Sequence, residues 1–578
     1  MSPFTTFRCG MWLALIMPLV LPGCAVHTAQ TGQEAVSQRA DDTSSEIAAY
    51  IIQSASTEEA AQAVRDAGGQ ITHELTVIRA VGAELDEMQV AQLREDHSGL
   101  RIYADHPVAL DAYFTFLQAP SNVQQRNGDD DDYEAPVGDA PHRIIGADRL
   151  HQDWIDGWGV GVAVLDTGAH SMTGLTSNDW RSVWHYDAVN NAFIGAGQSV
   201  DHSGHGTHVS SIIAADYTWD DEGFYGIAPA VDLISVAAFD ENGQGTYMDV
   251  IRGIDFVVTY KDKLNIRVLN LSLSAEINSF YWDDPLNQAV MAAWEAGIVV
   301  VASAGNRGPD PMTIGVPGNV PYVITVGAMT DNYTPYDPSD DYLATFSSTG
   351  PSYEGFVKPE LLAPGGHIEA MMPRTAQIKA EHVQYEEGPG LFVMSGTSQA
   401  TAVVSGVVAM MLQMEPDLTP DQVKYRLMAT ARPATKEGQP AYSVFQQGAG
   451  LVDAYAAVLG YNGDPAAAAN QGMSVTYDLA GKQHYGGRAN QDENGQFYLL
   501  DLDGFVWTDG FVWTDGFVWT DGFVWTNGFV WTDGFVWTDG FVWTDSYIWT
   551  DGFVWTDSYI WTDGLTEAAS INHWVEQE

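Results

Sequence analysis

The chain has 578 residues, and 24 Lys and Arg against 76 Asp and Glu give a formal net charge of −52. This length provides for several domains with a large core, and the 45% hydrophobic content excludes a wholly disordered chain. The acidic field argues against nucleic acid and anionic membrane surfaces as partners, because it repels polyanions. Both cysteines, Cys9 and Cys24, lie near the N-terminus, which excludes a disulfide framework or a cysteine metal site further along.

Residues 1–24 have the features of a secretory signal: a basic start, an apolar run over 11–21 and small residues before Cys24. The run is too short to span a membrane as a mature helix. The ending Leu-Pro-Gly-Cys resembles a bacterial lipobox, in which Cys24 becomes a lipid anchor, and cleavage near Ala29 without lipidation is the alternative. Cleavage with lipidation and cleavage without it both predict export from a bacterial cell, with the protein either anchored at the cell envelope or secreted.

Residues 45–118 alternate strand patterns with helix patterns, in the order β-α-β-β-α-β. This order predicts a small α+β unit that folds independently. The expected elements are a strand over 46–52, a helix from Thr57, a strand pair over 75–85, a helix over 88–93 and a strand over 100–103. An acidic linker over 119–141 follows, and we expect it to be solvated and cleavable.

From residue 142 to 461 apolar strands alternate with helices. Strand patterns cover 160–165, 266–271 and 297–302, and a helix pattern covers 285–296. Strands that are apolar on both faces are typical of a parallel sheet with helices on both sides, so we predict an α/β fold. In such sheets the functional groups gather beyond the carboxyl ends of the strands.

Three side chains at the ends of these elements can form a catalytic triad. Asp166 follows a buried strand, His205 precedes an apolar helix, and Ser398 opens a helical run. A serine hydroxyl needs a base to accept its proton, and the base needs a carboxylate to hold its tautomer. The helix start at Ser398 also favours negative charge, so these residues together predict nucleophilic catalysis.

The motifs around these residues resemble those of the subtilisin-like serine peptidases. They are Asp-Thr-Gly from Asp166, His-Gly-Thr-His from His205 and Gly-Thr-Ser ending at Ser398, and that family has the same order of triad residues. A fourth segment, Ala-Ser-Ala-Gly-Asn ending at Asn306, resembles the oxyanion-hole segment, which implies a donor role for the Asn306 side chain. The resemblance covers about 142–461 and implies an endopeptidase that works through an acyl-enzyme.

The resemblance also implies two walls that bind substrate, one of which accepts the substrate as an added strand. The wall residues are Ser272, Leu273 and Ser274 on one side and Ser303, Ala304 and Gly305 on the other. The family usually has Ser-Leu-Gly-Gly where this chain has Ser-Leu-Ser-Ala from Ser272, so specificity cannot be copied from relatives. Gln399 and Ala402 stand where the family usually has Met and Pro, which leaves the triad chemistry intact.

Residues 45–118 resemble the inhibitory propeptide of such enzymes, whose end lies in the substrate cleft and is cut there. We therefore expect self-processing after Tyr113 or within the linker that runs to Asp139, which would indicate a site for large apolar side chains. The expected partners are protein and peptide substrates and the chain's own propeptide. The chemistry requires no cofactor; structural calcium, common in relatives, remains open because no ligands can be assigned from this sequence.

Other enzyme classes fit the same residues less well. An aspartic peptidase needs two carboxylate motifs, and the chain has one Asp-Thr-Gly. The histidines at His202, His205 and His208 are spaced by three, but the zinc motif H-E-x-x-H is missing. We interpret His208 as a structural neighbour of the catalytic histidine and His170 as a surface residue.

After a connecting segment over 462–502, residues 503–562 form ten hexads, mostly Asp-Gly-Phe-Val-Trp-Thr. Asp-Gly between β-forming runs predicts hairpins with two-residue turns, in which Trp opposes Val, and a stacked solenoid is the competing interpretation. A low-complexity expansion without function is one interpretation of the repeat. The other is attachment of 503–564 to a surface polysaccharide or the outer membrane, before a tail over 565–578.

The main alternative to a peptidase is a cell-surface adhesin or binding protein that uses a peptidase-like scaffold. The complete set of Asp166, His205, Ser398 and Asn306 argues against this alternative, because a scaffold alone needs none of the four.

Overall fold

The computed structural model describes most of the chain outside its two ends. The described residues are 47–110, 141–176, 181–195, 201–217, 224–332, 334, 338–388, 390–436, 439–492, 495–499 and four short strands between 510 and 535. The predicted signal peptide with Cys24, the end of the predicted propeptide from 111, the predicted linker over 119–141 as far as 140, and the tail over 565–578 lie outside the described residues. No helix within the described ranges is long and apolar enough to cross a membrane.

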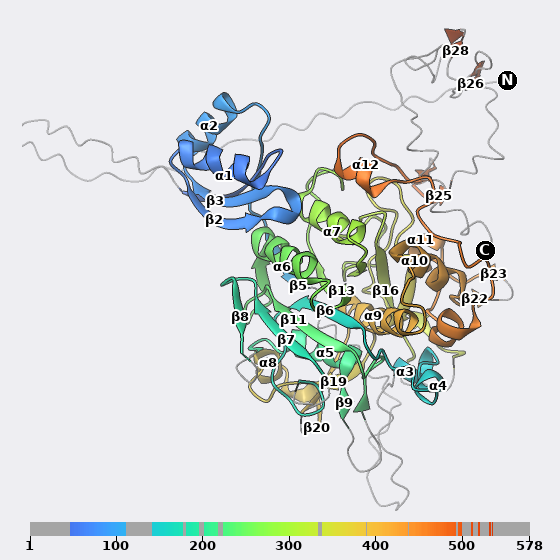
Figure 1. The fold of residues 1–578 in the computed structure, drawn as a ribbon. Coiled ribbons are helices and arrows are strands. Elements are labelled where there is room, and N and C mark those ends of the chain that lie inside the picture. Colours follow the sequence, from blue (N-terminus) through green and yellow to red (C-terminus); the bar gives the residue numbers. More distant parts are fainter. Residues whose placement is uncertain are drawn as a thin grey trace, which may run out of the picture. The chain divides into compact units, whose positions relative to one another are not determined.

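The N-terminal unit, residues 47–110, contains a four-stranded antiparallel sheet covered on one face by two helices (Figure 1, blue). Its elements are β1 (Ala48–Gln53), α1 (Thr57–Asp66), β2 (Gln70–Leu75), β3 (Ala80–Leu85), α2 (Glu87–Asp96), β4 (Arg101–Ala104) and β5 (Pro107–Leu110), with strand order β2-β3-β1-β4. Helix α1 begins where Ser56 accepts a hydrogen bond from Glu59 N, and α2 begins with a capping box of Asp86 and Gln89.

The predicted order of these elements is observed, but one boundary was wrong. The strand pair expected over 75–85 is a short 3-10 turn, Thr76–Ile78, followed by the single strand β3. Strand β3 pairs with β2 and β1, which both lie earlier in the chain. Strand β2 carries Gln70, Thr72 and His73 and is mostly not buried, so it lacks the apolar pattern by which strands are predicted.

The centre of the chain folds into a nine-stranded sheet of order β17-β16-β15-β13-β6-β11-β7-β8, with β18 paired to β16. All of its pairings are parallel except β7–β8 and β16–β17 at the two ends. The strands are β6 (Gly161–Asp166), β7 (Val183–Asp187), β8 (Ala192–Ile194), β11 (Asp232–Ala237), β13 (Ile266–Leu271), β15 (Val299–Ser303), β16 (Ile324–Thr330), β17 (Tyr342–Leu343) and β18 (Leu361–Pro364). The predicted α/β fold with a parallel sheet is therefore confirmed.

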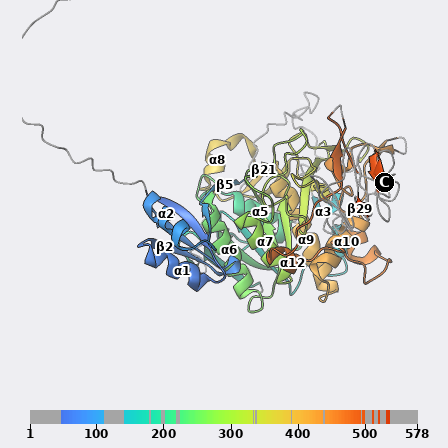
Figure 2. The same ribbon diagram turned by 90° about the horizontal axis from the view of Figure 1, so that it is seen from above.

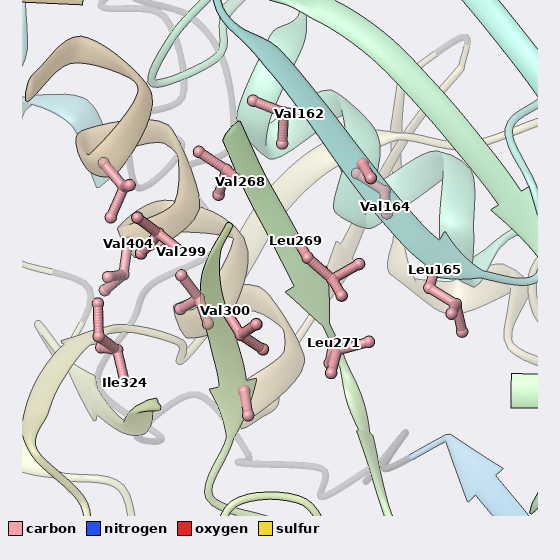
Figure 3. Close-up of a cluster of buried hydrophobic side chains, with 14 of the residues drawn as sticks. Val162, Val164, Leu165, Val268, Leu269, Leu271, Val299, Val300, Ile324 and Val404 are labelled. Carbon is pink, nitrogen blue, oxygen red and sulfur yellow. The ribbon is translucent and has the colours of Figure 1, made fainter. Parts of the chain in front are cut away.

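Helices cover both faces of this sheet (Figures 1 and 2). Helices α6 (Tyr247–Tyr260) and α7 (Pro285–Glu295) lie together on one face, and α5 (His205–Ala214) and α9 (Thr397–Met414) lie on the other. The central strands β6, β13 and β15 are buried on both sides, and Val404 of α9 joins their side chains in one cluster (Figure 3). Burial on both faces explains why these strands read as continuous apolar runs.

The N-terminal unit packs through its other sheet face against α6 and α7. Ile51, Leu75 and Ile78 belong to the same buried cluster as the core of the large sheet. Polar bonds flank this apolar contact: Gln53 Nε2 donates to Gln288 Oε1 at 2.6 Å, and Val77 N donates to Asp255 Oδ1 at 2.6 Å. The two parts thus share one interface with apolar and polar contacts.

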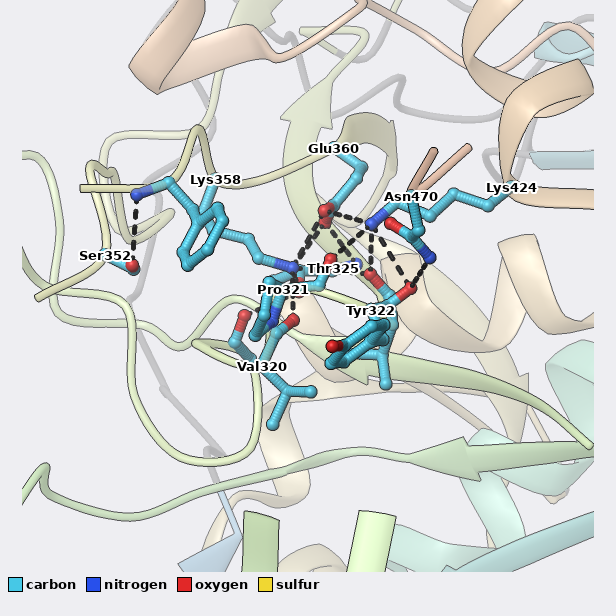
Figure 4. Close-up of polar contacts among 12 residues, drawn as sticks. Val320, Pro321, Tyr322, Thr325, Ser352, Lys358, Glu360, Lys424 and Asn470 are labelled. Carbon is cyan, nitrogen blue, oxygen red and sulfur yellow. Dashed lines mark hydrogen bonds and ion pairs between the residues drawn. The ribbon is translucent and has the colours of Figure 1, made fainter. Parts of the chain in front are cut away.

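A buried charge cluster fixes the loop before β16 (Figure 4). The Glu360 carboxylate bonds the ammonium groups of Lys358 and Lys424, each with a closest distance of 2.8 Å, and also accepts from Thr325 N. Both lysines donate to backbone carbonyls of residues 320–323 and are fully buried. Burial lowers the pKa of Lys358 to about 7. The loop is therefore held by two lysine side chains that share one carboxylate.

The remaining elements are smaller. They are α3 (Pro141–Ile144), α4 (Asp148–His151), β9 (Asp216–Tyr217), β10 (Phe224–Tyr225), β12 (Gln244–Thr246), β14 (Leu273–Ser274), β19 (Ile368–Met371), α8 (Gln377–Glu381), η2 (Val383–Tyr385), β20 (Glu386–Gly388), β21 (Leu391–Met394), α10 (Pro420–Ala429), β22 (Thr435–Lys436), β23 (Gln439–Pro440), α11 (Val444–Gln447), η3 (Ala456–Gly460), α12 (Val475–Leu479), β24 (Ala489–Gln491) and β25 (Phe497–Leu499). The connecting segment is joined to the large domain at Asp478, which accepts hydrogen bonds from Tyr281, Tyr322 and His484.

Four short strands lie within the hexad repeat. Strand β26 (Gly510–Val512) pairs with β27 (Val518–Thr520), and β28 (Trp531–Thr532) pairs with β29 (Gly534–Phe535), both antiparallel. Antiparallel strands were expected, but the predicted register was wrong here, because Phe positions stand opposite Trp positions. Both faces of such strands carry similar residues, so the sequence specifies register only weakly.

Candidate active site

The predicted carboxylate and imidazole meet at the carboxyl edge of the large sheet. Asp166 is the last residue of β6, which lies between β11 and β13, and His205 is the first residue of α5. His205 Nδ1 lies 2.7 Å from Asp166 Oδ1, and both side chains are almost completely buried. Thr167 N also donates to Asp166 Oδ1, at 2.8 Å. This geometry can hold the imidazole in the tautomer that a general base requires.

Ser398 is the second residue of α9, which packs against α5. In this structure its Oγ donates to the Ser272 carbonyl at 3.3 Å, and Ser272 Oγ donates to the Ser398 carbonyl at 3.1 Å. These two bonds tie the start of α9 to the first residue of the predicted substrate wall. A hydroxyl at this helix start lies in the field of the unpaired backbone N–H groups.

Asn306 lies beside the same helix start and is 5% exposed. Its Oδ1 accepts hydrogen bonds from Thr397 N at 2.9 Å and from Thr397 Oγ1 at 3.0 Å. Because the acceptor end of the amide is fixed in this way, Nδ2 is the end with which it donates. The arrangement suits a side chain that stabilises an oxyanion at Ser398.

Asp201 is a site residue that the sequence analysis missed. Its carboxylate accepts four hydrogen bonds, from Thr167 Oγ1 (2.8 Å), Gly204 N (2.8 Å), Thr207 N (2.7 Å) and Thr207 Oγ1 (2.7 Å). Burial raises the pKa of Asp201, and these four bonds act against that shift. Asp201 thereby ties the turn after β6 to the first turn of α5. An acidic residue just ahead of a helix was the available signal in the sequence.

His208 lies one turn after His205 and is fully buried. Its Nε2 donates to the Phe392 carbonyl at 2.9 Å, and Gln399 Nε2 lies 3.5 Å from Nδ1. Burial lowers the pKa of His208 to about 3, so the ring is neutral at ordinary pH.

His170 is half-buried, so the prediction that it lies on the surface was wrong, and its backbone N–H donates to Thr207 Oγ1. Among the described residues, no three or more His, Cys, Asp and Glu side chains are grouped to hold a metal ion.

The end of the N-terminal unit lies between two strands of the large domain. Strand β5 is the middle strand of a three-stranded sheet, with β12 on one side and β14 on the other. In this antiparallel register Leu110 stands opposite Leu273, and Ala109 stands opposite Ser274. Ser303 Oγ donates to the Leu273 carbonyl at 2.9 Å, which joins the two predicted walls. A polypeptide segment thus already occupies the position of an added strand.

Comparisons with known proteins agree with this geometry. The model of the subtilase family, Peptidase S8, matches residues 157–450. Serine protease AprX of Bacillus subtilis (strain 168) is 37% identical over 311 residues, which are 53% of this chain and 67% of AprX. Subtilisin E of the same organism is 30% identical over 397 residues, which are 68% of this chain and 84% of subtilisin E.

Among solved structures, fervidolysin from Fervidobacterium pennivorans matches with a TM-score of 0.54 and 25% sequence identity. The match covers 73% of this chain and 62% of fervidolysin, which is described as a keratinolytic enzyme related to subtilisin. The likeness extends beyond residues 157–450, to which the family model is confined.

Proposed function

The chain belongs to the subtilase family and is a serine endopeptidase of the subtilisin-like fold, and on that basis we propose that Asp166, His205 and Ser398 are its catalytic triad. The observation that carries this assignment is the buried 2.7 Å contact between His205 Nδ1 and Asp166 Oδ1. Asn306, fixed at the start of α9 by Thr397, is the proposed oxyanion donor.

In the proposed mechanism Ser398 Oγ attacks the carbonyl carbon of the scissile bond while His205 Nε2 accepts the hydroxyl proton. Asp166 holds Nδ1–H and stabilises the imidazolium. Asn306 Nδ2 and the Ser398 backbone N–H donate to the oxyanion, which is the charge that develops in the transition state. His205 then protonates the leaving amine. In the second half water gives a proton to His205 and attacks the acyl carbon, and the bond from that carbon to Ser398 Oγ breaks as Oγ takes the proton from His205.

The N-terminal unit is proposed to act as an inhibitory propeptide. Strand β5 pairs with β14 next to Ser272, so it occupies the position at which a substrate would add as a strand. Asp105 Oδ1 accepts from Met248 N at 3.1 Å and so caps the start of α6. The same unit that blocks the wall therefore also stabilises the domain that it inhibits.

Export and attachment are further parts of the proposal and rest on the sequence. The segment ending at Cys24 directs the protein out of a bacterial cell, by secretion or by a lipid anchor at the envelope. The tryptophan-rich residues 503–564 hold the enzyme at a surface, such as a polysaccharide or the outer membrane.

The test of the triad compares the matured wild-type enzyme with Ser398→Ala. Wild type should hydrolyse casein and react with a serine-directed fluorophosphonate, whereas Ser398→Ala should lose hydrolysis by at least about 10⁴-fold and take up no label. Ser443→Ala, at an exposed helix start, is the matched control and should behave as wild type. Equal hydrolysis by wild type and Ser398→Ala would refute the assignment. A folded wild type that is inert and unlabelled would favour the adhesin alternative.

A further inference from the structure

The register of β5 shows which residue of a bound chain reaches the nucleophile. Ala109 stands opposite Ser274 and Leu110 opposite Leu273, so the pairing runs toward Ser272. The carbonyl of Ser272 accepts the hydrogen bond from Ser398 Oγ. In a substrate bound with the same register, the residue after the partner of Leu273 would stand opposite Ser272, so the proposed mechanism has Ser398 attack the carbonyl of that residue.

Four residues meet at the end of the wall that carries Ser274, and we call them the Gly315 corner: Ser274, Ala275, Arg307 and Gly315. A Cβ placed on Gly315 would lie 2.2 Å from Ser274 Oγ, 2.7 Å from the Ala275 carbonyl and 2.7 Å from Arg307 Nη2. The corner is held in place by a bridge in which Ala275 N donates to Val316 O at 2.8 Å and Val316 N donates to Ala275 O at 3.0 Å. Two hydrogen-bond donors thus lie close to Gly315: the Ser274 hydroxyl, from one wall, and the Arg307 guanidinium, from the segment that follows the other wall.

Both donors lack an acceptor for their side chains within the described part of the chain. Ser274 is 8% exposed, and its buried Oγ has no hydrogen-bond partner among the described residues. Arg307 is exposed and directly follows Asn306. In the same described ranges, arginine–carboxylate pairs within 4.0 Å are made instead by Arg65, Arg101, Arg252, Arg426 and Arg432. A buried hydroxyl beside an unneutralised cation is a site suited to a carboxylate.

We infer that the Gly315 corner selects an acidic residue, aspartate or glutamate, on the acyl side of the scissile bond. The inference rests on the proposed peptidase function. A substrate carboxylate accepts hydrogen bonds from the Arg307 guanidinium and the Ser274 hydroxyl, and bonds between ionised groups are stronger than neutral ones.

The chain's own sequence offers such a residue at the required position. Asp111 directly follows Leu110 in the sequence, although it lies outside the described residues. On the sequence alone we therefore expect the self-processing cut between Asp111 and Ala112, two residues before Tyr113. In this cut the Asp111 carbonyl carbon is transferred from the Ala112 nitrogen to Ser398 Oγ, His205 protonates the released amine, and water then hydrolyses the ester.

The first experiment measures kcat/KM of the matured enzyme for fluorogenic peptides that differ only at the residue before the cut: Glu, Asp, Gln, Leu or Lys. We expect the Glu peptide to exceed the Gln peptide by about tenfold or more. Arg307→Gln should bring this ratio close to one, and Arg307→Glu should make Lys better than Gln. The control is Lys263→Gln, which removes an exposed charge before β13, at the opposite edge of the sheet, and should keep the wild-type ratio.

The second experiment identifies the amino terminus of the matured protein by mass spectrometry. The expected product begins at Ala112, and Asp111→Asn should slow its formation. A preference for Leu with an unchanged Glu-to-Gln ratio in Arg307→Gln, or a mature chain that begins after Tyr113, would overturn this inference and leave the triad assignment standing. Failure of every peptide together with no fluorophosphonate labelling would instead overturn the proposed function.

Discussion

Asp201 shows how one side chain can position two others without taking part in the reaction. It bonds Thr167, which follows the proposed catalytic carboxylate, and it bonds the backbone of Gly204 and Thr207 on either side of His205. All four of its bonds have the Asp201 oxygens as acceptors. We therefore expect Asp201 to support the hydrogen bond between Asp166 and His205, although it bonds neither of these side chains.

Replacing this carboxylate by an amide is a sharp test of positioning. Asp201→Asn replaces one carboxylate oxygen by an N–H₂ group, which cannot accept a hydrogen bond. One oxygen of Asp201 now accepts from Thr167 and Gly204 and the other accepts twice from Thr207, so in either orientation of the amide at least one buried donor loses its acceptor. We expect kcat/KM to fall by about 10- to 100-fold, and the apparent pKa on the acid limb of its pH profile to shift, because His205 is held less firmly.

The pH profile separates positioning from a general loss of stability, since partial unfolding lowers the amount of active enzyme without moving the acid limb. Asp153→Asn, at an exposed position, is the control. A variant Asp201→Asn with a wild-type rate and a wild-type pH profile would show that Asp201 has no positioning role.

The residues proposed to carry the chemistry were predictable because each belongs to a short motif at the end of an element. Asp166, His205, Ser398 and Asn306 lie within local sequence patterns, and the structure places them at one edge of the sheet or at the start of α9. The proposed role of Arg307 was not predictable, because it arises from contacts between segments that are distant in sequence. Asp201 offered one signal, its place just ahead of a helix, but its bond to the distant Thr167 could not be predicted.

At the scale of elements, the strands that could be predicted are those that carry a local sequence pattern. Strands β6, β13 and β15 are buried along their lengths and were predicted within a few residues. Strands β5 and β14 have four and two residues and show no strand pattern of their own, because only their partners define them. Strand β5 was not predicted, and β14 was expected only through the resemblance of the segment from Ser272 to a substrate-binding strand. The substrate wall was therefore inferred from a resemblance, and its register came from the structure.

Asp255 lies at the interface between the N-terminal unit and α6, where burial makes its charged form less stable. Asp255 accepts the hydrogen bond from Val77 N, but burial raises its pKa to about 6 from an ordinary value of 3.8. The associated state therefore binds the proton more tightly than the separated state, in which α6 is exposed. Between pH 4 and 6 association must weaken as the pH rises.

This sign gives a measurable prediction for release of the N-terminal unit. In a Ser398→Ala catalytic domain, affinity for an added fragment of residues 47–110 should fall by up to about tenfold per pH unit between pH 4 and 6. Asp255→Asn keeps an acceptor for Val77 N and removes the titration, so its binding should change less over the same range, as followed by calorimetry. Asp262→Asn, at an exposed site just beyond the same helix, should keep the wild-type slope. A steeper or unchanged slope in Asp255→Asn would contradict the prediction.

At the scale of the whole molecule, the connecting segment packs into the core of the catalytic domain. Asp478 of α12 accepts hydrogen bonds from Tyr281 at 2.5 Å and from Tyr322 at 3.0 Å, and both tyrosines are almost fully buried. His484 lies 2.6 Å from the same carboxylate and stacks on Trp282. The connecting segment is thus part of the folded core, whereas the predicted boundary of the catalytic domain at 461 lies before these contacts.

Two truncations test separately what the repeat and the connecting segment contribute to stability and activity. A chain that ends at residue 502 keeps Asp478 and should retain the peptide hydrolysis and the free energy of unfolding of the full chain, while losing any retention at a surface. A chain that ends at residue 469 leaves the Tyr281 and Tyr322 hydroxyls without their acceptor, so its free energy of unfolding in urea should fall by about 3 kcal/mol or more. Asp478→Ala in the chain that ends at 502 removes the acceptor without shortening the chain and should reproduce a large part of that loss. If the chain that ends at 469 were as stable as the one that ends at 502, the tyrosine contacts to Asp478 would contribute nothing to the core, and the domain would end where the sequence analysis placed its boundary.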